Sequence, residues 1–513
     1  MRKAMRKQST FVIESSRFES LFTSEIKGIQ GVQIEISRKK DPFPTASLRL
    51  KKELQTVVKN PISHRASTKR ACRRRAARSV FGVLLMAASI LATGVQADQP
   101  TSKKASAFPI QDPYLATVIG TPPALQTHLD PPLKLKIGRW VRFPKRDVPP
   151  VFWNGKTLRY AWAAQTKAAP LVFVLAGTGG SFFDSKVRFL MGALHQAGFH
   201  VVGLSSPTHT SFITAGSQYE MPGRPAADAE DLMAVMEQIR DQLADRIEIQ
   251  GFGVVGYSLG GTDAAFIADL DTRQKKFDFF EVYLINPAVN LHTSAKILDQ
   301  LYDQALPEGE ESINQLVSNS LKKAIHYVHS TGSTPLGSDF IFQAVTALQP
   351  TDQDLEGVIA TSFRLSSANM SFTADAMTHS GRIVKPDQTL RIGTEMEGYF
   401  DESLQWSFVR YLEELLLPFW EEQTQLDRDT LIAQSSLASI QDFLKEARHV
   451  DVVTNRDDII LGPGDLEFLS QTFGPRATIH PHGGHCGNLE FAPNVETMQK
   501  RFVTAAQARG WTP

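Results

Sequence analysis

Hydrophobic residues between positions 136 and 290 follow two alternating patterns. Short apolar runs of strand length are separated by longer stretches in which apolar residues recur every three or four positions, as on one face of a helix. The run 170–175 is apolar throughout, which is typical of a strand buried on both faces. Strands that alternate with helices of 10–18 residues predict βαβ units and a mainly parallel sheet. The expected strands are 137–143, 156–163, 170–175, 199–204, 247–255 and 280–285, with helices at 185–197 and 226–243 and a hairpin turn at Asn154-Gly155.

The pattern changes after residue 290. Helical periodicity without a convincing strand continues to residue 449, and a helical insertion explains this length better than a loop. Strand-like residues then resume at 449–453. The fold class is therefore predicted as α/β: a mainly parallel sheet flanked by helices, formed by residues 136–290 and 450–513, with a helical lid domain, residues 291–449, inserted over the sheet edge. The later elements are expected as helices at 312–328, 404–417 and 431–447, a short strand at 477–479 and a closing helix at 495–508.

The N-terminal part of the chain lacks these patterns. Residues 1–68 are polar and basic without sustained periodicity, so we expect disorder there. The segment 69–97 resembles a secretory signal peptide, because a cluster of arginines precedes the apolar run 80–95 and Val95-Gln96-Ala97 has the small residues that signal peptidase prefers. Residues 98–135 are rich in Pro, Thr and Lys, which is typical of a linker or arm.

Charge is distributed unevenly along the chain. Residues 1–80 carry 20 Lys and Arg against 6 Asp and Glu, so of the chain's 55 basic and 54 acidic residues the remainder holds 35 and 48. An acidic body repels phosphates, and this argues against nucleic acid as a partner. Export to the periplasm or the medium is the predicted localisation. The alternative is an anchor formed by an uncleaved segment, although 16 apolar residues are few for a membrane span.

The two cysteines do not predict a disulfide. Cys72 lies inside the signal-like segment and leaves with it, so Cys486 remains alone in the mature chain. We interpret Cys486 as a small packed residue.

The most informative motif is Gly256-Tyr257-Ser258-Leu259-Gly260. It follows the strand-like residues 247–255 and precedes a helix-like segment from Thr262 to Leu270. A strand that turns sharply into a helix exposes the residue at the turn, and small residues two positions before and after it let the chains pass. This context predicts a nucleophilic Ser258 with elbow glycines Gly256 and Gly260. A Gly-rich turn with an incidental serine is the alternative.

A serine nucleophile needs a base and an acid that orients the base. Two later strand ends supply these residue types: Asp457 and Asp458 follow the strand at 449–453, and His485 follows the strand expected at 477–479. All three strands end at the same sheet edge in a parallel sheet, so these side chains are expected beside Ser258. Their order along the chain is serine, aspartate, histidine.

In these motifs and in this order the chain resembles the α/β-hydrolase fold superfamily over about residues 136–290 and 450–513. The resemblance implies His485, in Gly483-Gly484-His485, as the base. It also implies Asp458 as the acid, at the last position of a Gly-x-x-Asp type of turn. Asn455 stands where that turn usually has glycine, and this departure keeps Asp457 as the runner-up acid.

The same resemblance implies an oxyanion hole of two backbone N–H groups. Leu259, directly after the nucleophile, supplies the first. Thr178, in the loop 176–180 after the buried strand, is the best match for the second. A phosphate-binding P-loop is the alternative interpretation of loop 176–180, but the loop lacks the lysine and the following Ser or Thr.

A zinc site is an alternative interpretation of His480, His482 and His485, with Asp457 or Asp458 as a further ligand. A complete serine triad already uses these residues, so no metal and no cofactor are expected. The apolar stripes of the insertion are interpreted mostly as helix packing, and some of Phe340, Phe342, Phe372 and Trp406 are expected to line the acyl pocket.

The sequence therefore predicts an enzyme, an esterase-like or lipase-like serine hydrolase that cleaves a carboxylic ester or related acyl bond through an acyl-enzyme intermediate. Its expected partner is a small-molecule or lipid-like acyl substrate, with membrane attachment only if the signal segment is uncleaved. Acyl transfer or peptide cleavage on the same triad is one alternative. A catalytically silent binding module with this fold is another.

Overall fold

The computed structural model of the 513-residue chain describes residues 34–36, 48–50, 107–305 and 350–513. The chain divides into two compact units, residues 1–103 and residues 104–513. None of the described helices is long and apolar enough to cross a membrane.

The first unit contains one described ladder, in which strand β1 (Ile34–Ile36) pairs antiparallel with strand β2 (Leu48–Leu50). Both strands lie within the segment 1–68, for which disorder is predicted. The rest of that segment and the whole signal-like segment 69–97 lie outside the described residues.

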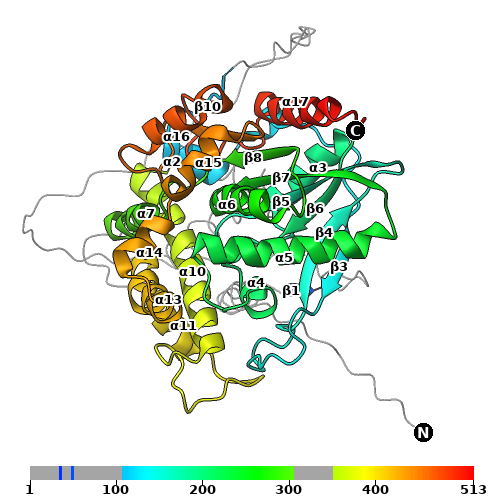
Figure 1. The fold of residues 1–513 in the computed structure, drawn as a ribbon. Coiled ribbons are helices and arrows are strands. Elements are labelled where there is room, and N and C mark those ends of the chain that lie inside the picture. The colour runs from blue at the N-terminus through cyan, green and yellow to red at the C-terminus, as the bar shows by residue number, and fades with distance from the viewer. Residues whose placement is uncertain (1–33, 37–47, 51–106, 306–349) are drawn as a thin grey trace, which may run out of the picture. The chain divides into compact units, whose positions relative to one another are not determined.

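The second unit is built on an eight-stranded sheet in the order β10-β9-β8-β7-β5-β6-β4-β3 (Figure 1). The six strands from β10 to β6 run parallel to one another, whereas β4 pairs antiparallel with β6 and with β3. The predicted mainly parallel sheet is confirmed. Its strands are β3 (Lys136–Trp140), β4 (Leu158–Ala163), β5 (Ala169–Leu175), β6 (His200–Leu204), β7 (Ile249–Tyr257), β8 (Glu281–Ile285), β9 (Val450–Asn455) and β10 (Ala477–His480).

Helices cover both faces of the sheet because successive side chains of a strand point to opposite faces. On β5, Phe173 packs in the cluster that contains α5 (Pro225–Ala244) and α6 (Leu259–Gln274). Its neighbour Val174 packs in the cluster that contains α3 (Ser185–Gln196) and α17 (Ala492–Ala508). Burial on both faces explains why this strand is apolar throughout.

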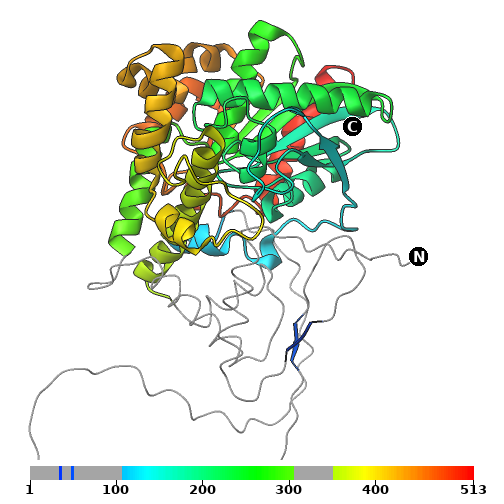
Figure 2. The ribbon, with the colours of Figure 1, turned by 90° about the horizontal axis from the view of Figure 1, so that it is seen from below.

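A helical insertion lies between β8 and β9, as the sequence predicts, and Figure 2 shows it, in green to orange, beside the sheet. Its apolar side chains pack in one cluster with residues outside it, such as Phe152, Ile213 and Ile460, and Trp406 is fully buried in this cluster. Its described elements are α7 (Leu291–Ala305), α10 (Asp352–Thr378), α11 (Glu397–Leu404), α12 (Phe408–Tyr411), the π-helical turn η2 (Leu412–Leu416), α13 (Leu417–Thr424), α14 (Arg428–Gln434), the 3₁₀ turn η3 (Leu437–Ile440) and α15 (Gln441–Glu446).

The helix boundaries predicted inside the insertion are wrong in two places. The segment 404–417 is not one helix, because the Ser407 side chain accepts a hydrogen bond from the Arg410 N–H and starts a new helix there. The segment 431–447 is interrupted in the same way by Ser436, which caps η3. The helix predicted at 312–328 lies outside the described residues.

Other differences concern the connections. Strands β3 and β4 pair as predicted, but the chain between them runs over residues 141–157 rather than through a two-residue hairpin at Asn154-Gly155. The predicted linker 98–135 carries a helix. Helical segments that the sequence patterns did not predict are α2 (Pro113–Ile119), η1 (Pro123–Leu125), α4 (Thr210–Ala215), α16 (Asp465–Phe473) and η4 (Gly474–Arg476).

Candidate active site

Ser258 occupies a sharp turn between β7 and α6. Its φ of 55° lies in the left-handed region, which a non-glycine residue adopts only at a conformational cost. The glycines around it are needed for close packing: a Cβ at Gly256 would lie 1.9 Å from the Gly260 carbonyl oxygen, and a Cβ at Gly260 would lie 2.5 Å from the Ala176 carbonyl oxygen. The turn therefore holds the Ser258 side chain at the carboxyl end of β7.

The structure brings Ser258, His485 and Asp458 together in one hydrogen-bonded chain. His485 Nε2 lies 2.9 Å from Ser258 Oγ, and His485 Nδ1 lies 2.9 Å from Asp458 Oδ1. The side chains come from the ends of three different strands, and each residue is less than a tenth exposed. This is the geometry in which a histidine can accept the serine proton while a carboxylate orients the ring.

The two neighbouring aspartates have different partners. Asp458 accepts hydrogen bonds from His485 through Oδ1 and from Asn286 Nδ2 through Oδ2, the latter at 2.7 Å. Asp457 instead accepts from the backbone N–H groups of Gly483 and Gly484, at 3.3 and 3.0 Å. Asp458 thus contacts the His485 imidazole, whereas Asp457 binds the backbone of the loop that contains His485.

The loop 176–180 lies against Ser258. A Cβ at Gly177 would lie 3.0 Å from Ser258 Cβ, and the Gly179 N–H donates to Thr208 Oγ1 at 2.8 Å. Within residues 107–305 and 350–513, the N–H groups of Leu259 and Thr178 have no hydrogen-bond acceptor in the protein.

Helix α10 of the insertion covers this loop and the base. Ser366 Oγ would lie 2.8 Å from a Cβ at Gly179, and the Phe363 ring centroid lies 6.4 Å from that of His485. Farther along the same helix, Thr373 Oγ1 lies 3.1 Å from Thr210 Oγ1 of α4. These contacts place one face of α10 against loop 176–180, His485 and helix α4.

The predicted aromatic lining is placed differently. Phe372 packs against Phe152 of the β3–β4 connection and Tyr399 of α11, with ring centroids 5.9 and 6.2 Å away, and Trp406 is fully buried in the same apolar cluster. Phe340 and Phe342 lie outside the described residues. The aromatic residue of α10 that does contact the base, Phe363, was not singled out from the sequence.

Helix α2, in the predicted linker, is part of the site. Its Thr117 Oγ1 accepts a hydrogen bond from the His485 backbone N–H at 2.9 Å and donates to the Pro113 carbonyl at 2.6 Å. A Cβ at Gly484 would lie 2.2 Å from the same Pro113 carbonyl oxygen, so glycine is required where the histidine loop meets this helix. Helix α2 thus holds the backbone at His485 in place.

The neighbours of His485 raise the pKa of its imidazole and so favour its protonated form. Burial lowers the pKa of His485, but the neighbouring Cys486 and the Asp458 carboxylate raise it more strongly, so its pKa lies above the ordinary 6.5. Cys486 is buried, and its Sγ lies 4.0 Å from His485 Nε2. It is a packed residue of the site, as predicted.

The three histidines of the loop do not converge. His482 Nδ1 lies 3.5 Å from Asp457 Oδ2, His485 joins Ser258 and Asp458, and His480 lies in β10. The described residues contain no group of three or more side chains that could hold a metal ion.

Comparisons with known proteins give only distant structural likenesses. No family model matches the chain, and no curated protein matches it in sequence. Among solved structures, an esterase of Pyrococcus furiosus is 11% identical with a TM-score of 0.35, covering 70% of this chain and 86% of its own.

Two further likenesses are of the same kind. The thioesterase domain of the curacin biosynthetic pathway is 14% identical with a TM-score of 0.33, covering 72% and 99% of the two chains. A proline iminopeptidase-related protein of Thermus thermophilus is 18% identical with a TM-score of 0.32, covering 73% and 98%. Similarity at this level carries no information on the substrate of this chain.

Proposed function

We propose that this chain, which has the α/β-hydrolase fold, is a serine hydrolase that cleaves a carboxylic ester or a related acyl bond. One observation carries the proposal: a strained serine at a strand-to-helix turn is joined to His485 and Asp458 by two contacts of 2.9 Å each. Packing alone does not require a serine in a strained backbone conformation at this turn. Nucleophilic catalysis does require an exposed serine hydroxyl that is hydrogen-bonded to a base.

The proposed reaction has two halves. Ser258 Oγ attacks the substrate carbonyl carbon as His485 Nε2 takes the hydroxyl proton, and Asp458 stabilises the imidazolium that forms. The N–H groups of Leu259 and Thr178 donate to the oxyanion, helped by the positive dipole end of α6. His485 then protonates the leaving group as the carbonyl–leaving-group bond breaks. A water molecule, deprotonated by His485, cleaves the acyl-enzyme and restores Ser258.

Helix α10 lies over loop 176–180. Ser366 faces Gly179 of this loop, and Thr373, seven positions farther along the helix, lies 3.1 Å from Thr210 of α4. We propose α10 as the lid of this site.

A probe of the serine and an ester substrate test this function. We expect a fluorophosphonate probe to label Ser258 and the mature chain to hydrolyse p-nitrophenyl butyrate. Absence of both labelling and ester hydrolysis would favour a silent binding module. Amide hydrolysis that exceeds ester hydrolysis would favour a peptidase, and product formation only with an added alcohol acceptor would favour acyl transfer.

The pH dependence of kcat/KM is a further expected result. His485 must be neutral to accept the serine proton, and its pKa is raised by Cys486 and Asp458 against the effect of burial. Activity is therefore present above this pKa and is lost about tenfold per pH unit below it. We expect an apparent pKa above 6.5 in the free enzyme. A profile that stays level as the pH falls through 6.5 would contradict the role of His485.

Export is a separate proposal that depends on the signal-like segment 69–97. Cleavage after Ala97 leaves Asp98 at the mature N-terminus, which N-terminal sequencing of the secreted or periplasmic chain would identify. A mature chain that begins before Arg73 would contradict it.

A further inference from the structure

The acid and the base of the proposed triad stand on two separate segments, and one asparagine contacts both. Asp458 follows strand β9, and His485 follows strand β10. Asn455 is the last residue of β9 and is completely buried. It occupies the position where the resemblance to α/β-hydrolases leads us to expect glycine, so a side chain here calls for a physical reason.

The main chain and the side chain of Asn455 hydrogen-bond to different segments. Its carbonyl oxygen accepts a hydrogen bond from the Asp458 N–H at 3.2 Å. Its Nδ2 donates to the carbonyl oxygen of Gly484, the residue directly before His485, at 2.7 Å. A single residue is therefore bound both to the acid and to the segment that carries the base.

Asn488 pairs with Asn455 and extends this connection. Asn488 Nδ2 donates to Asn455 Oδ1 at 2.6 Å, and Asn455 Nδ2 donates to Asn488 Oδ1 at 3.2 Å. Asn488 Nδ2 also lies 3.3 Å from the His482 carbonyl oxygen, to which it donates. The two amides thus bind the main chain of the histidine loop at residues 482 and 484, just before His485.

The orientation of both amides is determined by these contacts. Each Nδ2 donates to a main-chain carbonyl, so turning either amide over would place two oxygen atoms against each other. The loop also packs closely on the pair: a Cβ at Gly483 would lie 2.5 Å from Asn488 Nδ2 and 2.6 Å from Asn455 Nδ2. The pair therefore leaves the loop little freedom to shift.

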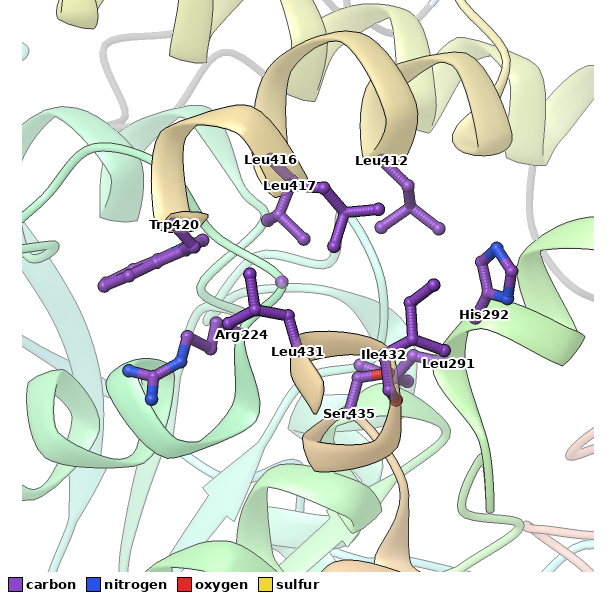
Figure 3. A pocket seen from close by; sticks show the side chains of 11 residues that line it. Arg224, Leu291, His292, Leu412, Leu416, Leu417, Trp420, Leu431, Ile432 and Ser435 are labelled. Carbon is purple, nitrogen blue, oxygen red and sulfur yellow. The ribbon is translucent and has the colours of Figure 1, made fainter. Parts of the chain in front are cut away.

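Hydrogen bonds suit this junction better than apolar packing does. Within the insertion, Figure 3 shows Leu412 and Leu416 facing Leu431 and Ile432, and contacts of this kind are non-directional. A hydrogen bond instead restricts both the distance and the angle between its groups. Buried amide hydrogen bonds can therefore set the separation of two segments that must keep a fixed geometry.

We propose that Asn455 is a positioning residue, which together with Asn488 holds the histidine loop at the distance from which His485 contacts Asp458 at 2.9 Å. The inference rests on the proposed hydrolase function. It also predicts that glycine, the usual residue at this position of such turns, impairs this chain.

Asn455→Gly tests the inference directly. We expect kcat for p-nitrophenyl butyrate to fall by about 10²-fold with KM nearly unchanged, because His485 is no longer held in its place beside the acid. The apparent pKa of kcat/KM should fall as well, since Asp458 raises the pKa of His485 only while the two are in contact. A variant that merely loosens the fold would lower the unfolding temperature without moving this pKa.

Asn488→Ala and Asn494→Ala form a matched pair of uncharged truncations in the same segment. Asn494 Nδ2 donates only to the Asn488 carbonyl oxygen, which also accepts from the Phe491 N–H. We expect kcat to fall about tenfold in Asn488→Ala and to stay within about twofold in Asn494→Ala. Asn488→Ala also keeps the test open if Asn455→Gly does not fold. Combined with Asn455→Gly, it should add little further loss, because the two asparagines act as one unit.

The proton between His485 Nδ1 and Asp458 gives a readout that needs no turnover. In the Ser258→Ala chain, at a pH that protonates His485, this proton is expected as a downfield ¹H NMR resonance. The resonance should shift upfield or disappear in Asn455→Gly and stay unchanged in Asn494→Ala.

Two results would overturn the inference. One is a kcat of Asn455→Gly equal to that of the unsubstituted chain, and the other is an Nδ1 resonance that this substitution leaves unchanged. If the unsubstituted chain neither reacts with the fluorophosphonate probe nor cleaves esters, the hydrolase function fails instead. The NMR comparison still decides the role of Asn455 in that case.

Discussion

Replacing Ser258 with alanine is expected to lower kcat/KM for an ester by about 10⁵-fold or more while the fold is retained. The hydroxyl is the only group removed, and the bond it forms with the substrate has no substitute at this turn. Water activated by His485 leaves only the residual rate that the oxyanion hole and substrate binding supply. Steady-state kinetics of the purified variant, with circular dichroism to show that it is folded, measure this effect.

The same position offers a control that separates catalysis from stability. Glycine adopts the φ of 55° at residue 258 without a Cβ clash, whereas alanine keeps the strain. Ser258→Gly should therefore be as inactive as Ser258→Ala, yet more resistant to unfolding by about 1 kcal/mol. Substantial turnover in either variant would exclude Ser258 as the nucleophile. Equal stability of the two would mean that the turn is not strained.

Local patterns predicted the parts of the fold that depend on local rules. The apolar run at 170–175 became a strand buried on both faces, since each of its side chains faces a helical layer. Gly256 and Gly260 were predicted to allow a close passage of chains, and both leave no room for a Cβ. A steric requirement of this kind involves only a few adjacent residues, so it can be recognised from the sequence.

Contacts between distant segments could not be predicted in the same way. Thr117 and Asn286 hold the backbone of His485 and the carboxylate of Asp458, but each stands far from its partner in the sequence. Thr117 stands in a Pro-rich segment and Asn286 follows a strand, and neither local sequence indicates a hydrogen bond to His485 or Asp458. The arm was therefore predicted as a linker.

The insertion was predicted as helical, but its arrangement was not. Helix α10 is the longest described helix, yet its many Ser, Thr and Ala residues give little contrast between an apolar and a polar face. Some of its polar residues face the protein rather than solvent, because Ser366 packs against Gly179 of loop 176–180. Periodicity in the sequence identifies a helix, whereas tertiary packing determines which face of that helix lies against the core.

The two adjacent aspartates give the second large expected effect. Asp458→Asn is expected to lower kcat by about 10³- to 10⁴-fold with little change in KM, because an amide cannot stabilise the imidazolium and can select the wrong tautomer of His485. The isosteric change also removes a charge that raises the pKa of His485, so the apparent pKa of kcat/KM should fall. Kinetics across the pH range measure both effects.

Asp457→Asn is the matched control, since it makes the same chemical change one residue away. Asp457 accepts from the N–H groups of Gly483 and Gly484 and does not contact the imidazole. An asparagine oxygen can still accept one of these hydrogen bonds, so the expected loss in kcat is about tenfold or less, with a small decrease in the unfolding temperature. Because both variants place an amide on the same turn, a general disturbance of the loop would affect them alike. Equal losses, or a larger loss for Asp457→Asn, would move the role of the acid away from Asp458.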